Sequence, residues 1–206
     1  MMKKSTCKVW EIALLLALAV TLLWGARSAH NQDALARKMI RLHVIANSDT
    51  QEDQTLKLQV RDKVLTQATA ILKESENMTQ AVRKLNRALP EIEHVAAQEI
   101  STQGYDYGVT ARLENTEFPT KEYDGFRLPS GEYLALRVVI GDGAGKNWWC
   151  VVYPPLCTTA ATDLEKTAIA AGLDEKDISL ITEEDGYVLK FRAVELWENI
   201  RTWLGK

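Results

Sequence analysis

A short apolar strand that runs through a polar corner into an amphipathic helix is the most constraining feature of this chain. Residues 40–46 show the period-two pattern of a half-buried strand. Asn47, Ser48 and Asp49 then interrupt the pattern, and side chains of these types bond nearby backbone N–H groups at turns and helix starts. Apolar residues recur at helical spacing over residues 56–71, so we expect a helix that begins at or just after Asp49.

Two interpretations of this corner stay open. Ser48 followed by Gln51 fits a capping box, and an Asn-Ser-Asp run before a helix is most often a cap. The density of charges of both signs nevertheless exceeds what a solvated face requires, so the corner is also a candidate recognition surface. The candidate partner-binding residues of this segment are Arg41, His43, Asn47, Ser48, Asp49, Asp53 and Arg61.

Composition narrows the class of protein. The net charge of −3 and the pI near 5.7 give no global electrostatic reason to bind nucleic acid. Charged residues make up 26% and hydrophobic residues 46% of the chain, which excludes a disordered chain and a multi-span membrane protein. At 206 residues, the chain is long enough for one domain with an anchor and a tail.

The N-terminus has the layout of an export signal. Lys3, Lys4 and Lys8 precede an apolar run over residues 12–24, and a polar stretch follows. The run is shorter than the roughly 20 apolar residues that span a bilayer. We expect cleavage after Ser28, with an uncleaved membrane anchor as the alternative.

Two cysteines remain after this segment, and their spacing suits an exported protein. Cys150 and Cys157 are seven residues apart, with Pro154 and Pro155 between them. Closing so short a loop stabilises a fold by about 2 to 3 kcal/mol in the entropic model. We expect a disulfide, with two free buried thiols as the alternative. Two cysteines alone make no structural zinc site, and we expect neither a metal nor a cofactor.

The segment NWWCVVYPPLC, residues 147–157, is a second candidate recognition surface. Trp148 and Trp149 are adjacent on a predicted strand, so they must point to opposite faces of its sheet. Two consecutive prolines then end the strand and stiffen the corner. Rigid aromatic and proline-bounded loops suit protein recognition because docking costs them little entropy. The candidate partner-binding residues of this segment are Trp148, Trp149, Pro154 and Pro155.

The glycine-rich segment between two predicted strands, Gly141 to Asn147, is not a phosphate-binding loop. Such a loop requires a glycine and a serine or threonine at the positions that Ile140 and Asn147 occupy. The dinucleotide fingerprint fails as well, because the segment leads into a strand and not into a helix. We interpret it as a glycine-rich hairpin connection.

The whole pattern predicts an α+β fold with a single domain. We expect a mainly antiparallel sheet of about four strands packed by helices, with the direction of the first strand open. Pro90 should kink or split the second helix, and residues 115–130 have the composition of a long loop. The predicted parts are a signal peptide or membrane anchor over residues 1–28, an α+β domain over 29–157, an acidic linker region over 158–186 and a C-terminal helix over 187–206. Within 158–186 we expect one short helix, capped by Thr162 or Asp163, that ends at Gly172.

Three segments resemble the stage II sporulation protein R family of endospore-forming bacteria. They are RLHVIANSDTQEDQTLKLQVRDKV (residues 41–64), GEYLALRVVI (131–140) and NWWCVVYPPLC (147–157), and their order and separation also look like the family. The resemblance implies a signalling protein exported from the forespore into the space between forespore and mother cell. There it would activate a membrane-embedded aspartic protease that processes the sigma-E precursor, and it would act as a ligand and not as an enzyme.

Two other functions stay open from the residues alone. The chain is an exported enzyme if His43 works with Asp49 or Asp53 as an acid/base pair, although no nucleophile is placed by a motif. It is a passive envelope binding module if no partner responds to it.

Overall fold

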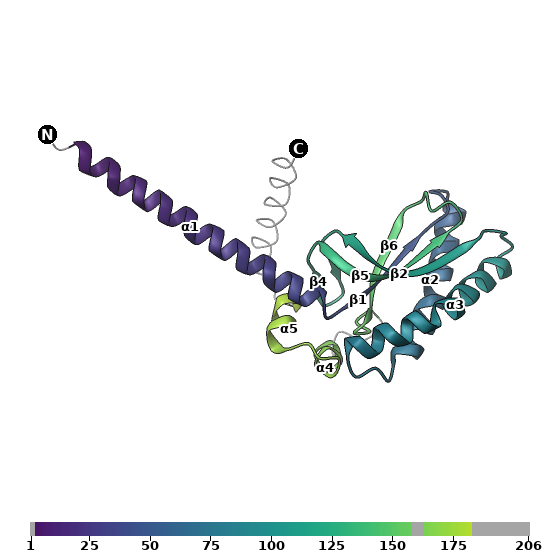
Figure 1. The fold of residues 1–206 in the computed structure, drawn as a ribbon. Helices are drawn as coiled ribbons and strands as arrows, with labels where there is room; N and C mark the ends of the chain where they lie inside the picture. Colours follow the sequence, from purple (N-terminus) through teal and green to yellow (C-terminus); the bar gives the residue numbers. More distant parts are fainter. Residues whose placement is uncertain (1–2, 158–162, 183–206) are drawn as a thin grey trace. The chain divides into compact units, whose positions relative to one another are not determined.

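A computed structural model describes residues 3–157 and 163–182 (Figure 1). The chain divides into two units, residues 1–34 with 183–206 and Leu35–Thr182. The described part of the first unit belongs to helix α1 (Lys3–Ala36). From Lys8 onward this helix is long and apolar enough to cross a membrane, and export signal sequences share that property. It is therefore compatible with the predicted signal or anchor segment, whereas the predicted C-terminal helix lies outside the described residues.

The second unit is built around a four-stranded sheet with the strand order β2-β5-β1-β6. Its strands are β1 (Ile40–Ile45), β2 (Val109–Phe118), β5 (Gly131–Ile140) and β6 (Asn147–Tyr153). The central strand β1 pairs in parallel with β5 and antiparallel with β6, while β2 pairs antiparallel with β5. The prediction of an α+β fold with a mainly antiparallel four-stranded sheet is therefore confirmed.

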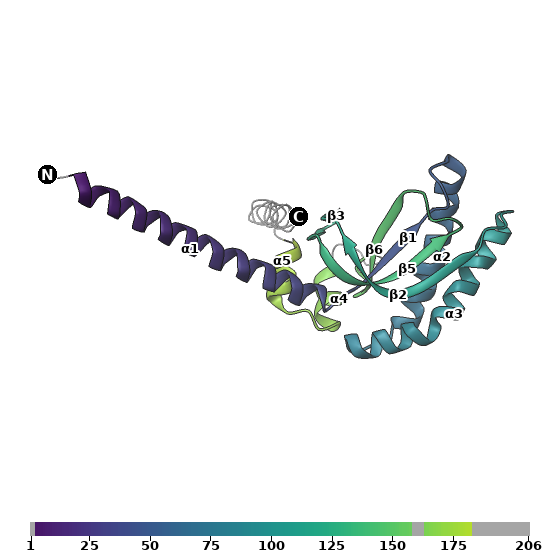
Figure 2. The ribbon, with the colours of Figure 1, turned by 45° about the horizontal axis from the view of Figure 1, so that its top comes forward.

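Helices α2 (Gln51–Leu72) and α3 (Met78–Thr102) cover one face of this sheet (Figure 2). Leu42 and Val44 of β1 belong to the same buried cluster as the apolar stripe of α2. Pro90 lies inside α3 without ending it, so of the two predicted outcomes, a kink or a split, the split does not occur. We call the opposite face of the sheet, which includes Arg41 and His43, the helix-free face because neither α2 nor α3 covers it. At one end of this face, Val151 packs with residues of α4 and α5.

Two segments differ from the prediction, and both contribute to a second apolar cluster around Val151. Residues 115–130 are not a loop, because β2 extends to Phe118 and a separate hairpin follows, with strands β3 (Lys121–Tyr123) and β4 (Phe126–Leu128). The region predicted as a linker contains two short helices, α4 (Leu164–Ala170) and α5 (Glu175–Thr182). Helix α4 matches the short helix expected to end at Gly172. Helix α5 buries only three side chains, which leaves too weak a periodicity to recognise. The apolar residues of both helices pack in this cluster with Leu35 and Met39.

The glycine-rich connection does not form a hairpin. Strands β5 and β6 are not neighbours, because β1 lies between them. The connection crosses the end of β1, where the N–H groups of Ala144 and Gly145 donate to the carbonyls of Asn47 and Ala46. The hairpin interpretation is therefore wrong, and the segment packs against the strand-helix corner instead.

Candidate functional site

The polar corner between β1 and α2 is a network of structural hydrogen bonds. The carboxylate of Asp53 is buried and accepts from Asn47 Nδ2 at 2.9 Å and from the Ser48 hydroxyl. Thr50, and not Ser48, is the N-cap of α2, and its side chain accepts from the Asp53 N–H. The bonds from Ser48 and then Asn47 hold the pKa of the Asp53 carboxyl below its ordinary value.

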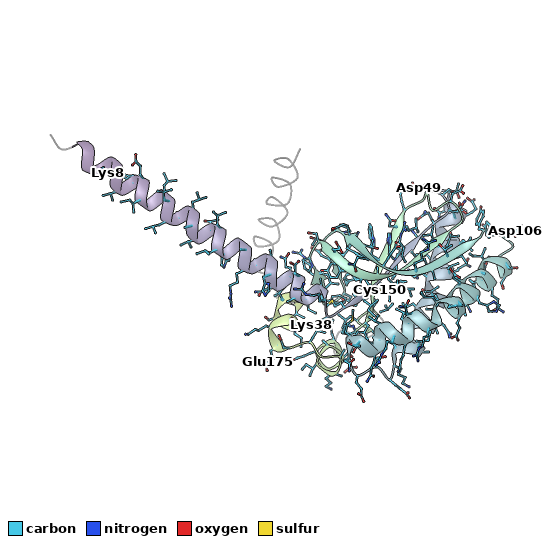
Figure 3. All side chains as sticks on the ribbon, in the orientation of Figure 1. Lys8, Lys38, Asp49, Asp106, Cys150 and Glu175 are labelled. Atoms are coloured by element: carbon cyan, nitrogen blue, oxygen red, sulfur yellow. A yellow bond between two sulfur atoms is a disulfide. The ribbon has the colours of Figure 1, made fainter. Side chains whose placement is uncertain are left out.

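The same corner fixes the glycine-rich connection. Asn47 Oδ1 accepts from the Asp142 N–H at 3.0 Å, and Asp49 Oδ1 accepts from the Lys146 N–H at 2.7 Å. The buried Lys57 ammonium donates to the Lys146 carbonyl, and burial lowers the pKa of this lysine. A Cβ at Gly145 would lie 2.2 Å from the Ser48 carbonyl oxygen, so only glycine fits there. Asp49 is exposed at the outer end of the corner (Figure 3).

Arg41 is fully buried and does not belong to a recognition surface. Its guanidinium lies 4.0 Å from the ring centroid of Phe118 and 4.8 Å from that of Tyr133, and it donates to the Tyr123 hydroxyl at 2.7 Å. Burial lowers its pKa. The prediction that Arg41 is available to a partner is therefore wrong, because the strand turns this side chain beneath aromatic rings.

His43 is also buried on the helix-free face, with 7% of its surface exposed. Its Nε2 lies 2.9 Å from Asn147 Oδ1, and its ring stacks on Trp149. Burial lowers its pKa, so the imidazole is neutral at pH 7. No described contact joins His43 to Asp49 or Asp53, so the acid/base pair of the enzyme hypothesis is not assembled. Among the described residues, no group of three or more His, Cys, Asp or Glu side chains is placed to hold a metal ion.

A row of four side chains crosses the helix-free face at one level. Arg112 of β2 is paired with Arg137 of β5, which is paired with His43 of β1, which is paired with Trp149 of β6. We call these four residues the cross-sheet row. Reasoning from sequence missed Arg112 and Arg137, because only the strand order places them beside His43 and Trp149.

The surroundings of the row are polar and hollowed. Arg137 Nη1 forms an ion pair with Glu114 at 3.0 Å, and the Lys121 ammonium lies 4.4 Å from the ring centroid of Trp149. A hollow of about 190 Å³ adjoins the row. Its lining residues are Thr110, Arg112, Glu114, Arg137 and Val139.

The two tryptophans point to opposite faces of the edge strand β6, as predicted. Trp149 lies on the helix-free face, whereas Trp148 packs with the cluster under α2 and lies 4.6 Å beneath the Arg61 guanidinium. Arg61 also forms an ion pair with Asp62 at 2.6 Å. Both tryptophans are partly exposed, and they remain candidates for contact with a partner.

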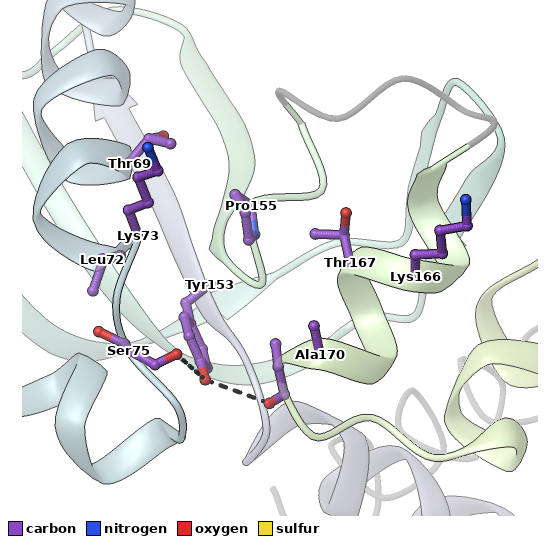
Figure 4. Close-up of a pocket in the computed structure, with 10 residues that line it drawn as sticks. Thr69, Leu72, Lys73, Ser75, Tyr153, Pro155, Lys166, Thr167 and Ala170 are labelled. Atoms are coloured by element: carbon purple, nitrogen blue, oxygen red, sulfur yellow. Dashed lines mark hydrogen bonds between the residues drawn. The ribbon is translucent and has the colours of Figure 1, made fainter.

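The proline corner lies beside a pocket that the sequence did not reveal. A disulfide joins Cys150 to Cys157, and Pro154 is buried whereas Pro155 is half-buried. Pro155 and Tyr153 line a pocket of about 370 Å³ whose other walls come from the end of α2 and from α4 (Figure 4). The Tyr153 hydroxyl lies 3.4 Å from the carbonyl oxygens of Ser75 and Ala171. No local motif marks this pocket, because its walls are distant in sequence.

Comparison with known proteins gives one consistent result. The family model described as Stage II sporulation protein R (spore_II_R) matches residues 36–163, which include β1, the corner and the disulfide loop. Stage II sporulation protein R of Bacillus subtilis (strain 168) is 35% identical over 160 residues, which cover 76% of this chain and 71% of that protein. No solved structure matches the chain.

Proposed function

The chain belongs to the stage II sporulation protein R family, and on that premise we propose that it is an exported signal that activates a membrane-embedded aspartic protease. The protease processes the precursor of sigma-E in the mother cell. The chain is made in the forespore and acts in the space between the two cells. Family membership, which assigns the chain a role in sporulation, is the observation that carries this proposal.

The N-terminal helix supports the proposed location. Helix α1 is long and apolar enough to serve as a signal or an anchor from Lys8 onward. Either use moves the second unit out of the cytoplasm in which the chain is made. An oxidising compartment also suits the disulfide between Cys150 and Cys157.

The side chains of the second unit support a ligand more than a catalyst. His43, the histidine considered as a general base, is buried between the rings of Phe118 and Trp149 and is hydrogen-bonded to Asn147. Partly exposed Trp148 and Trp149, each with a cation over its ring, are the residue types that dominate protein interfaces.

A reconstituted processing assay tests the proposal. The sigma-E precursor and the protease are expressed in a non-sporulating host, with or without the full chain carrying its own N-terminal segment. We expect the precursor to be shortened only when all three are present, and to stay intact when the protease's catalytic aspartates are replaced. Processing at the same rate without this chain would refute the activator role.

A further inference from the structure

The helix-free face carries positive charge that the fold does not neutralise. Arg112 and Arg137 are direct cross-strand partners, and like charges in this arrangement repel each other. Glu114 forms an ion pair with Arg137, but among the described residues Arg112 forms none. The chain as a whole has a net charge of −3, so this excess of positive charge is local.

The charge of Arg112 has no structural task that the contacts of the described residues reveal. Lys57 also lies near a corner of the sheet, but it donates to the Lys146 carbonyl and to Gln54 and so holds two segments together. Arg112, in contrast, is exposed on the edge strand β2 beside the hollow of about 190 Å³. Two like charges directly opposite each other on neighbouring strands disfavour each other, and an anion bound beside them would offset that repulsion.

The other end of the cross-sheet row supplies an aromatic contact on a rigid base. Trp149 is partly exposed, and the buried ring of His43 supports it. The Tyr123 hydroxyl, which accepts from Arg41, also lies 3.4 Å from the Trp149 carbonyl oxygen. A tryptophan held in this way loses little conformational entropy when it is covered.

We propose that the helix-free face, along Arg112, Arg137 and Trp149, docks an acidic extended segment of the protein partner. The identity of that partner as the protease rests on the proposed function. The guanidinium groups pair with carboxylates of the segment, and Trp149 takes an apolar side chain of it. The positive charge of the face favours an acidic partner segment. The combination of arginine with a partly exposed tryptophan favours a polypeptide, which carries both carboxylates and apolar side chains.

A lipid surface fits this face less well. Electrostatic binding to anionic membranes uses clusters of about four to eight basic residues. Here the cations are Arg112, Arg137 and Lys121, and Glu114 neutralises one of them. The acidic polypeptide therefore accounts better for the composition of the face.

Site-specific photo-crosslinking identifies what covers the face. A photoreactive amino acid is placed in the full chain at Thr110 or Val139, both of which line the hollow, and as controls at Arg83 or Arg87 on α3. We expect crosslinks to the protease from the hollow positions only, to a segment with net negative charge. Crosslinks from the α3 positions alone, or to a segment without acidic residues, would overturn the proposal.

Charge reversal supplies a functional readout. In the processing assay, Arg112→Glu together with Arg137→Glu should reduce the rate at least about tenfold, because each lost charge-assisted bond weakens binding by a factor of that order. The matched pair Arg83→Glu and Arg87→Glu should leave the rate within about twofold, since surface charges away from an interface contribute little. Arg112→Glu alone is tested as well, in case the double variant does not fold. Arg112 is exposed and forms no ion pair with the part of the chain that the structure describes.

The outcomes separate the two proposals. If the unaltered chain stimulates processing and the Arg112→Glu variant does so equally well, the docking face is wrong while the activator role stands. If the unaltered chain has no effect on processing, the activator role fails, and crosslinking to other exported proteins still tests the face. Flotation with phosphatidylglycerol vesicles checks the lipid alternative, and binding that Arg112→Glu abolishes would overturn the polypeptide proposal.

Discussion

At the scale of single residues, the surroundings of Arg41 explain how a positive charge is stabilised in the interior of the sheet. Arg41 has no carboxylate within its described contacts, and the faces of Phe118 and Tyr133 with the Tyr123 hydroxyl surround its guanidinium. Aromatic faces stabilise a desolvated cation, and arginine keeps its charge even where burial lowers its pKa. Arg41 therefore contributes to the core and not to recognition.

Replacement of Arg41 tests this role. We expect Arg41→Ala to lower the free energy of unfolding by about 2 to 4 kcal/mol, because it leaves a cavity beneath two rings and the Tyr123 hydroxyl without its donor. Urea denaturation of the full chain in mild detergent, followed by tryptophan fluorescence, measures the change. Arg87→Ala on α3 is the matched control and should stay within about 0.5 kcal/mol. Equal stability of the two variants would contradict the buried role.

His43 predicts a dependence of stability on pH. Burial is the main cause of its lowered pKa in the folded chain, and the nearby Arg137 acts in the same direction, while the bond with Asn147 opposes them. The unfolded chain therefore takes up this proton first, so the contribution of His43 is complete above about pH 6.5 and is lost as pH falls through its folded pKa.

A substitution isolates this contribution. Relative to His43→Phe, the unaltered chain should lose stability between pH 7.5 and pH 5, because the variant has no imidazole to protonate there. Denaturation curves of both chains across this range give the difference. A difference in unfolding free energy that stays constant over the range would show that His43 is not buried as described.

At the scale of elements, the corner between β1 and α2 and the glycine-rich connection stabilise each other. Asn47 bonds Asp53 on one side and the Asp142 N–H on the other, while Asp49 accepts from the Lys146 N–H. Polar residues that looked dense enough for recognition thus satisfy backbone groups where three elements meet. The connection is glycine-rich because its backbone passes close to the corner, and not because it binds phosphate.

Two glycines form a matched pair for testing this contact. We expect Gly145→Ala to cost about 2 kcal/mol or more of unfolding free energy, because its Cβ would lie 2.2 Å from the Ser48 carbonyl oxygen. Gly108→Ala should have an effect near zero, since nothing lies within 4 Å of the Cβ position there. Equal denaturation midpoints for the two variants would mean that the connection does not press against the corner.

The disulfide loop at the end of β6 gives a second prediction about an element. Cys150 and Cys157 are seven residues apart, so reduction with dithiothreitol should lower the unfolding free energy by about 2 to 3 kcal/mol in the entropic model. The variant with both cysteines replaced by alanine should not respond to the reductant. An unaltered chain whose stability is insensitive to dithiothreitol would indicate free thiols.

The elements predicted from sequence are those whose apolar side chains recur at a regular helical or strand spacing. The apolar stripe of α2 and the alternation in β1 were enough for the α+β class and the four-stranded sheet. Periodicity carries no information on strand order, so the pairing of Arg112 with Arg137 and the position of the glycine-rich connection could not be predicted. Periodicity also does not distinguish a polar side chain buried beneath aromatic rings, such as Arg41, from one exposed to solvent. The short helix expected before Gly172 corresponds to α4, whereas α5 was too short to recognise.

At the scale of the whole molecule, the second unit has two unlike faces on one sheet. Helices α2 and α3 bury one face in the main apolar cluster. The other face carries the cross-sheet row, with a guanidinium at one edge and a tryptophan at the other. A fold of this kind presents a fixed array of charge and aromatic surface, which suits a protein that acts by contact with a partner.

Titration of purified full chain into reconstituted protease and sigma-E precursor tests the central claim most directly. The account predicts that the processing rate rises with the concentration of this chain and saturates, as expected when a ligand occupies a limited number of sites. It also predicts no cleavage at any concentration when the protease is omitted. Cleavage of the precursor by this chain alone, or a rate independent of its concentration, would contradict the account.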